Sequence, residues 1–102
     1  MAQNVIQHPM EPLGFVQLTG LTTAQGLESI PSGATVVWLQ ASVQGVRVRF
    51  DGIDPTASVG SLIVAGQEGV LICLTDLTKI RVINDTAGAV LNVSYFRPKP
   101  TG

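Results

Sequence analysis

The side chains that could carry out catalysis are few and widely spaced. His8 is the single histidine, and any Ser-His or Cys-His nucleophilic site would have to use it. It lies beside Pro9, and Glu11 is the nearest carboxylate along the chain. We therefore interpret His8 as a solvated or interface residue, and we expect no hydrolytic triad.

Two carboxylates, Asp51 and Asp54, lie close together in the sequence Asp51-Gly52-Ile53-Asp54-Pro55. The spacing is found in calcium loops, but the full calcium-loop pattern with its terminal bidentate glutamate is absent. Turn chemistry explains both residues, since aspartate bonds to downstream backbone and proline fixes φ. A divalent ion that bridges loops in an assembly remains the alternative.

The other polar motifs indicate no reaction. The remaining acids lie in or next to turns, and nothing in the sequence aligns two of them as glycosidase carboxylates would require. Gly60, Gly66 and Gly69 form neither nucleotide-binding fingerprint. We therefore expect a protein that is not an enzyme and that needs no cofactor and no metal.

The arginines are the most specific polar feature of the chain. Arg47 and Arg49 alternate with apolar residues along 45–50, a period of two that places the cations on one strand face and the apolar residues on the other. Arg81 also lies between two apolar residues. A solvated face is the simplest interpretation. Since guanidinium groups bind carboxylates in bidentate fashion, we predict that Arg47 and Arg49 pair with acids of a partner or with the 51–54 loop.

The end of the last expected strand adds further contact candidates. Tyr95 and Phe96 are adjacent, so one of them must face away from the core of a regular strand. Trp38 and Cys73 lie in apolar runs, and we interpret both as buried packing residues. The candidate partner-contact residues are Arg47, Arg49, Asp51, Asp54, Arg81, Tyr95, Phe96 and Arg97.

The elements that must position these residues are short strands. The chain has 102 residues, the length of one domain, and its turn signals recur at the spacing of a sandwich or barrel. We predict an all-β fold, an antiparallel β-sandwich or jelly roll of about eight strands, with a short helical turn near 21–26 or 76–78. The expected strands are 15–19, 26–30, 34–41, 45–50, 60–65, 69–74, 79–83 and 89–96.

Prolines mark both ends of the chain. Pro9 and Pro12 remove amide donors and favour extended backbone, so residues 1–14 are predicted to form an extended N-terminal arm. The sandwich domain is expected to occupy residues 15–97. Pro98 and Pro100 lie in the last five residues, which we interpret as a short C-terminal tail, 98–102.

Composition argues for burial by a partner. The chain is 45% hydrophobic and 13% charged, with a net charge of −1, so it has no field that would attract nucleic acid or an anionic membrane. No apolar run approaches the roughly 20 residues of a membrane-spanning helix. The segments 34–39 and 69–73 contain the apolar runs 36–39 and 70–73, which predicts strands covered on both faces. One cover is the opposing sheet, and the second could be another subunit.

Several of these motifs together resemble small virion structural proteins of tailed bacteriophages. They are VRVRFDGIDPTASVG at 46–60, VAG at 64–66, KIRVI at 79–83 and LNVSYFR at 91–97. The resemblance implies a β-sandwich made in the host cytoplasm and carried on the virion as a capsid decoration, or cement, protein. We expect a homotrimer on the capsid surface that contacts the major capsid protein or another virion protein. The alternative is a tail, connector or head-fibre component with a joining or host-adhesion role.

Overall fold

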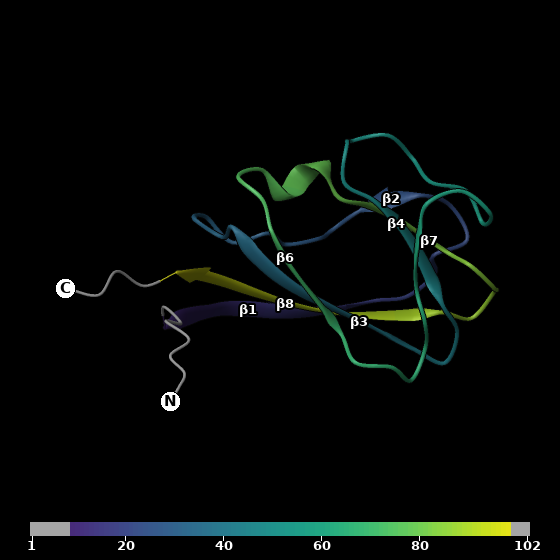
Figure 1. The fold of residues 1–102 in the computed structure, drawn as a ribbon, viewed down its shortest axis with the longest axis horizontal. Coiled ribbons are helices and arrows are strands. Elements are labelled where there is room, and N and C mark those ends of the chain that lie inside the picture. The colour runs from purple at the N-terminus through teal and green to yellow at the C-terminus, as the bar shows by residue number, and fades with distance from the viewer. Residues whose placement is uncertain (1–8, 99–102) are drawn as a thin grey trace, which may run out of the picture.

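Two four-stranded antiparallel sheets form the protein, and the computed structural model describes residues 9–98. Sheet A has the strand order β1-β8-β3-β6, and sheet B has the order β2-β7-β4-β5 (Figure 1). Sheet A consists of β1 (Met10–Leu18), β8 (Val90–Pro98), β3 (Val36–Ser42) and β6 (Val70–Cys73). Sheet B consists of β2 (Gln25–Gly26), β7 (Arg81–Asn84), β4 (Val46–Arg49) and β5 (Ser61–Ile63). The predicted all-β sandwich is confirmed.

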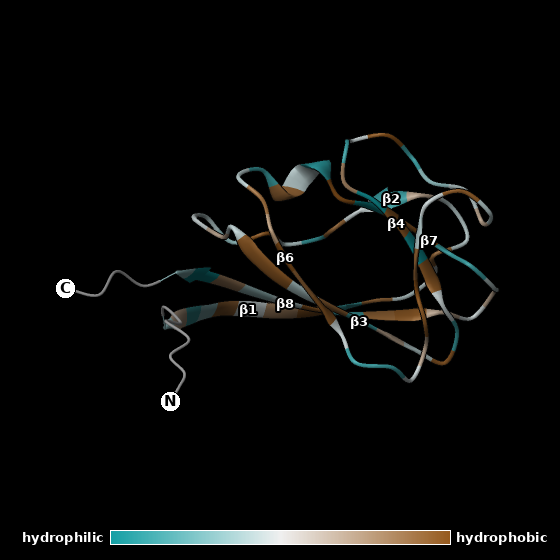
Figure 2. Cartoon of the chain, in the orientation of Figure 1, coloured by the Kyte–Doolittle hydropathy of each residue, from teal (hydrophilic) through white to brown (hydrophobic). Residues whose placement is uncertain are grey.

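The core lies between the two sheets and follows from alternation along the strands. In sheet A the residues at every second position of β3 and β8, such as Leu39 and Val93, are fully buried. Val48 and Val82 face them from β4 and β7 of sheet B and are equally buried. Figure 2 shows hydrophobic residues running along the strands, most clearly along β6 and β3. Period-two patterning therefore places alternate residues of the central strands β3, β8, β4 and β7 in the core.

The helical turn falls at the second of the two predicted positions. It is a 3-10 helix, η1 (Leu77–Lys79), which follows Asp76. The Asp76 carboxylate accepts hydrogen bonds from the Thr78 backbone N–H and from its hydroxyl group. These bonds lower the pKa of Asp76, the side-chain bond from Thr78 contributing most. The strand predicted at 26–30 is only β2, because the chain leaves the sheet after Gly26 and Ser29 adopts a φ of 54°.

The expected N-terminal arm is wrong for residues 10–14, which belong to β1. They pair with the end of β8, from Met10 opposite Pro98 to Gly14 opposite Tyr95, with a register shift between Pro12 and Gly14. Proline is tolerated here because β1 is an edge strand. On its open side no neighbouring strand needs the backbone N–H that proline lacks. Pro98, the expected start of the tail, is the last residue of β8. The rest of the arm and tail, 1–8 with His8 and 99–102, lies outside the described residues.

Tyr95 joins the core to the β2–β3 connection. Its side chain is 1% exposed, and its hydroxyl donates a hydrogen bond of 2.5 Å to the backbone oxygen of Glu28. Burial, followed by the nearby Glu28 carboxylate, raises the pKa of Tyr95 to about 12. The charged phenolate therefore cannot form without disturbing the packing between the sheets.

Tyr95 is the chain's one tyrosine, so its ionisation can be followed by ultraviolet absorbance. We predict a midpoint at about pH 12 in the native protein, against about 10 for an exposed tyrosine. Because the folded-state pKa is raised, the stabilisation from neutral Tyr95 is complete below pH 10. It is lost as the pH rises towards the folded-state value.

The control is Tyr95→Phe, which has no phenol to ionise. Urea unfolding should show that this variant loses less stability between pH 10 and pH 12 than the native chain does. A native titration midpoint near 10 would show that Tyr95 is not held between the sheets.

Candidate functional site

The predicted arginines lie together on the outer face of sheet B. Arg47 and Arg49 extend from β4, and Arg49 lies opposite Arg81 of β7. Each guanidinium group has a carboxylate of the same chain. Arg49 binds both oxygens of Asp51, at 3.1 and 2.5 Å, and Arg81 Nε donates to Asp54 at 2.7 Å. The sequence prediction of pairing with the 51–54 loop therefore holds for Arg49.

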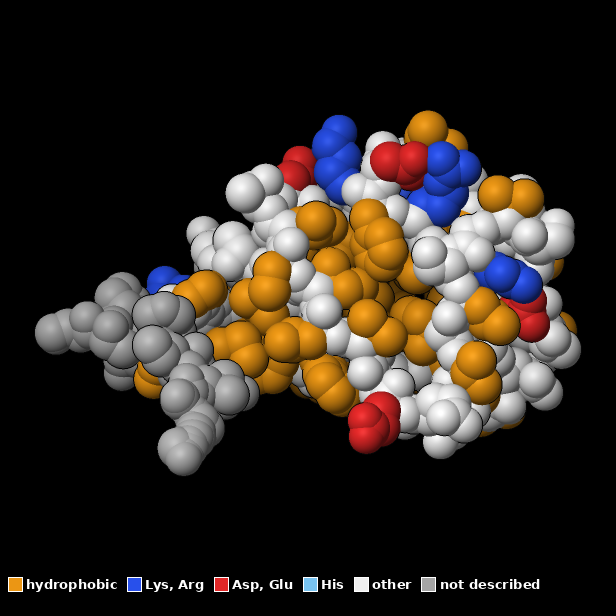
Figure 3. All heavy atoms as spheres, viewed as in Figure 1, with side chains coloured by type: hydrophobic (Ala, Val, Ile, Leu, Met, Phe, Trp, Pro, Cys, Tyr) orange, Lys and Arg blue, Asp and Glu red, His pale blue; other side chains and the backbone are white. Residues whose placement is uncertain are grey.

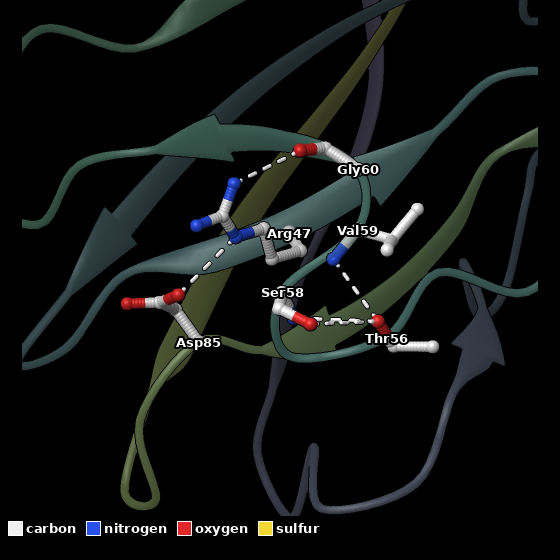
Figure 4. A network of polar contacts seen from close by, with 6 residues as sticks. All are labelled: Arg47, Thr56, Ser58, Val59, Gly60 and Asp85. Atoms are coloured by element: carbon white, nitrogen blue, oxygen red, sulfur yellow. Dashed lines mark hydrogen bonds and ion pairs between the residues drawn. The ribbon is translucent and has the colours of Figure 1, made fainter.

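Arg47 has a partner that the sequence did not indicate. Its Nε lies 3.2 Å from an oxygen of Asp85, and its Nη1 donates to the backbone oxygen of Gly60 at 3.0 Å (Figure 4). In the same view the Thr56 hydroxyl oxygen accepts the Val59 backbone N–H at 3.0 Å. Arg47 thus ties the start of β5 to the turn after β7.

Gly60 is the position where this arrangement requires glycine. Its φ is +134°, and an added Cβ would lie 3.1 Å from Pro55 and 3.2 Å from the Val48 backbone oxygen. A side chain there would strain the backbone and separate the loop from β4. The close approach of the 51–60 loop to β4 therefore requires glycine at position 60.

Asp51 and Asp54 behave as turn and ion-pair residues. Asp51 accepts the Ile53 backbone N–H at 3.3 Å, and the side-chain hydrogen bond from Arg49 lowers the pKa of Asp51. Within residues 9–98, no three His, Cys, Asp or Glu side chains lie close enough together to hold a metal ion. Both carboxylates are engaged by arginines of the same chain.

The end of β8 separates its three predicted contact residues. Tyr95 points into the core and does not reach the surface, so its expected role in partner contact is wrong. Phe96 is half-buried on the outer side of sheet A. Arg97 Nε lies 2.5 Å from a carboxylate oxygen of Glu11 in β1. Tyr95 therefore belongs to the core and Phe96 to the outer face, while Arg97 links β8 to β1.

Trp38 and Cys73, interpreted from the sequence as buried, are exposed on the outer face of sheet A. Trp38 is 38% exposed and lies opposite Leu71 of β6. Cys73 is likewise exposed. Their neighbours Val37 and Leu39 take the inward positions. The interpretation was wrong because no other layer of the described chain covers this side of the sheet.

A row of side-chain amides crosses the outer face of sheet A. Gln17 of β1 donates to Asn92 of β8 at 2.9 Å. Asn92 donates in turn to Gln40 of β3 at 2.9 Å and to the Ser42 hydroxyl at 3.1 Å. We call Gln17, Asn92 and Gln40 the amide row. The sequence alone does not reveal the amide row, because its members are brought together only by the register of three strands.

An exposed apolar area lies along β5 and β6, each of which is one of the two edge strands of its sheet. Figure 3 shows hydrophobic side chains gathered across the middle of one face, over β6, with charged side chains around the margin. Four exposed hydrophobic residues come from β5, from β6 and from the residue after β5; they are Leu62, Val64, Val70 and Leu71. We call this area the β5–β6 side.

Two open hollows complete the surface. One, of about 490 Å³, lies between the end of β4 and the start of β5 and is lined by residues including Arg49, Asp51 and Ser61. The other, of about 310 Å³, lies between β3 and β6 and is lined mainly by apolar atoms, with Val36, Cys73 and Pro98 among its residues. Arg49 and Asp51 bind each other in the first hollow, and the described residues that line the second include Cys73 but no charged side chain.

Comparison of the chain with protein-family models, with curated proteins and with solved structures finds no match. In the part of the chain from 9 to 98, no helix has the length and apolar character needed to cross a membrane. The candidate binding surfaces are therefore chosen from geometry alone. They are the outer face of sheet A, whose described residues carry no charge, and the β5–β6 side.

Arg47 and Arg49 offer a matched pair of truncations. Arg47→Ala should lower the free energy of unfolding by about 1–2 kcal/mol, because it leaves the half-buried Asp85 and the Gly60 oxygen without their donor. Arg49→Ala should cost less, because Arg49 bonds only to a residue two positions away. Urea unfolding at constant salt measures both. Equal losses in the two variants would contradict the role assigned to Arg47.

Proposed function

We propose that the protein is a structural component of a phage particle, a capsid decoration protein whose task is adhesion. The observation that carries the proposal is the β5–β6 side, where exposed apolar side chains lie along the edge strands of both sheets. The resemblance of residues 46–60 and 91–97 to small virion proteins supports the location on a phage head. The proposed partner is the major capsid protein or another virion protein, bound by a homotrimer of this chain.

The β5–β6 side has the physical properties of an attachment surface. An edge strand presents backbone donors and acceptors on its open side, and natural proteins usually protect such edges with charges or prolines. β6 has the sequence Val70-Leu71-Ile72-Cys73, with no charge and no proline. A contiguous exposed apolar area of this kind is typical of interaction sites. We therefore place the coat contact here.

The size of the chain is compatible with attachment by one side. Its accessible surface is 5774 Å², and a standard interface removes about 800 Å² from each partner. Apolar burial contributes about 25 cal/mol per Å² before association costs. A standard interface would therefore cover about a seventh of the surface of the chain.

The test uses particles of the phage that encodes the chain, purified with and without it. Mass spectrometry should find the chain at a copy number comparable to that of the coat protein. A single ring of copies would instead indicate a connector, and absence from the particles would contradict the proposal.

Val64 and Val43 provide a matched pair for locating the attachment surface. Val64→Glu should weaken particle binding at least tenfold, because a charge would be buried in an apolar contact. Val43→Glu introduces the same charge at a residue that is 71% exposed in the β3–β4 turn, and it should bind as the native chain does. Equal occupancy by both variants would remove the β5–β6 side from the proposed attachment.

A further inference from the structure

The outer face of sheet A combines exposed aromatic rings with the amide row, and the described residues on it carry no charge. We propose that this face binds a neutral oligosaccharide, with Phe15 and Trp38 stacking on sugar rings and the amide row binding sugar hydroxyl groups. The inference goes beyond particle attachment and concerns a different side of the sandwich, which adjoins the β5–β6 side at Leu71. Alternation and register place Phe15, Gln17, Trp38, Gln40 and Asn92 on this face.

The register aligns the aromatic and polar groups in two neighbouring rows. Phe15 of β1 and Trp38 of β3 both lie opposite Ser94 of β8. The amide row lies one two-residue step further along the same strands, which is about 7 Å away. Phe15 and Trp38 are separated by two strand spacings, about 10 Å. An extended chain of a few sugar rings can therefore contact both aromatic residues and reach the amides beside them.

Both aromatic side chains are available to a ligand. Phe15 is 63% exposed, the most open aromatic residue in the described chain. Trp38 lies over Gly69, where an added Cβ would come within 2.4 Å of its indole atoms. The backbone of Gly69 thus supports one side of the indole while 38% of the residue remains exposed. A supported ring is preorganised for stacking on the C–H face of a pyranose, because little side-chain entropy is lost on binding.

The amide row is held in place and still has hydrogen-bonding capacity. Asn92 is fixed at its centre by Gln17, Gln40 and Ser42. Gln40 accepts through its oxygen, and no described residue accepts a hydrogen bond from its amide nitrogen. Gln17 donates through its nitrogen, and no described residue donates to its oxygen. Adjacent sugar hydroxyl groups both donate and accept, and side-chain amides match this pattern.

Charge and polarity select the ligand class. A nucleic acid or an acidic polymer requires cations, and among residues 9–98 the outer face of sheet A has none. Arg97, the nearest cation on these strands, lies opposite Glu11 and pairs with it. An apolar protein surface packed on the amide row would bury its free donor and acceptor without partners, at a cost for each group. A neutral, hydroxyl-rich ligand satisfies both the amides and the aromatic rings.

The experiment screens the native chain on an array of neutral and anionic glycans. The neutral oligosaccharide with the strongest signal is then titrated in solution. Trp38 is the single tryptophan, so its fluorescence reports contact with the face directly. We expect saturable binding of a neutral glycan with a change in Trp38 emission. An array with no neutral binder, or with anionic binders alone, would overturn the proposal.

Two matched pairs of variants locate the site. Phe15→Ala and Gln40→Ala should each raise the Kd about tenfold. Phe50→Ala and Gln44→Ala remove the same side-chain types from the end of β4 and the β3–β4 turn, outside sheet A, and should leave the Kd unchanged. Equal effects within either pair would overturn the proposal.

Self-association and particle attachment provide the remaining outcomes. If sedimentation shows a dimer of the native chain that Phe15→Ala dissociates, a second copy occupies the face and the glycan proposal is wrong. Particle occupancy by Phe15→Ala should equal that of the native chain. Loss of glycan binding with retained occupancy separates this inference from the proposed attachment.

Discussion

The packing of β3 and β8 against sheet B is the contact on which every other feature depends. These two strands occupy the centre of sheet A, and their inward residues, such as Leu39, Leu91 and Val93, are fully buried. Since strand side chains alternate, fixing the inward set also fixes the outward set. A slip of one residue would place Trp38 and Asn92 in the core and expose the leucines. The outer face of sheet A is thus determined by the packing of its inner face.

The second constraint is the small number of charged side chains. Charged residues make up 13% of the chain, and the ion pairs of the described part join arginines to carboxylates of the same sandwich. Three of the four pairs lie on the sheet B side, where they fix the 51–60 loop and the turn after β7. On the outer face of sheet A, the residues that the structure describes are uncharged. The ion pairs are thus concentrated on the sheet B side. The same small domain keeps exposed apolar side chains on its other surfaces.

The sequence was sufficient for the fold because its signals are local. Period two along 45–50 and the glycine and proline turns specify strands and their approximate ends. The sequence was misleading at Met10–Gly14, where prolines indicated an arm although an open edge strand tolerates them. It was misleading again at Trp38 and Cys73, since an apolar run does not reveal whether its second face has a cover. The Arg47–Asp85 pair and the amide row depend on strand register, which becomes visible only in three dimensions.

We propose that the sandwich acts by adhesion through the β5–β6 side, and hydrogen–deuterium exchange of the chain, free and bound to purified particles, is the decisive experiment. We expect binding to protect the amides of Val70–Cys73 and of the neighbouring β5, while the amides of the 51–60 loop exchange as in the free chain. Exchange that is unchanged on particles, or protection confined to the 51–60 loop, would contradict it.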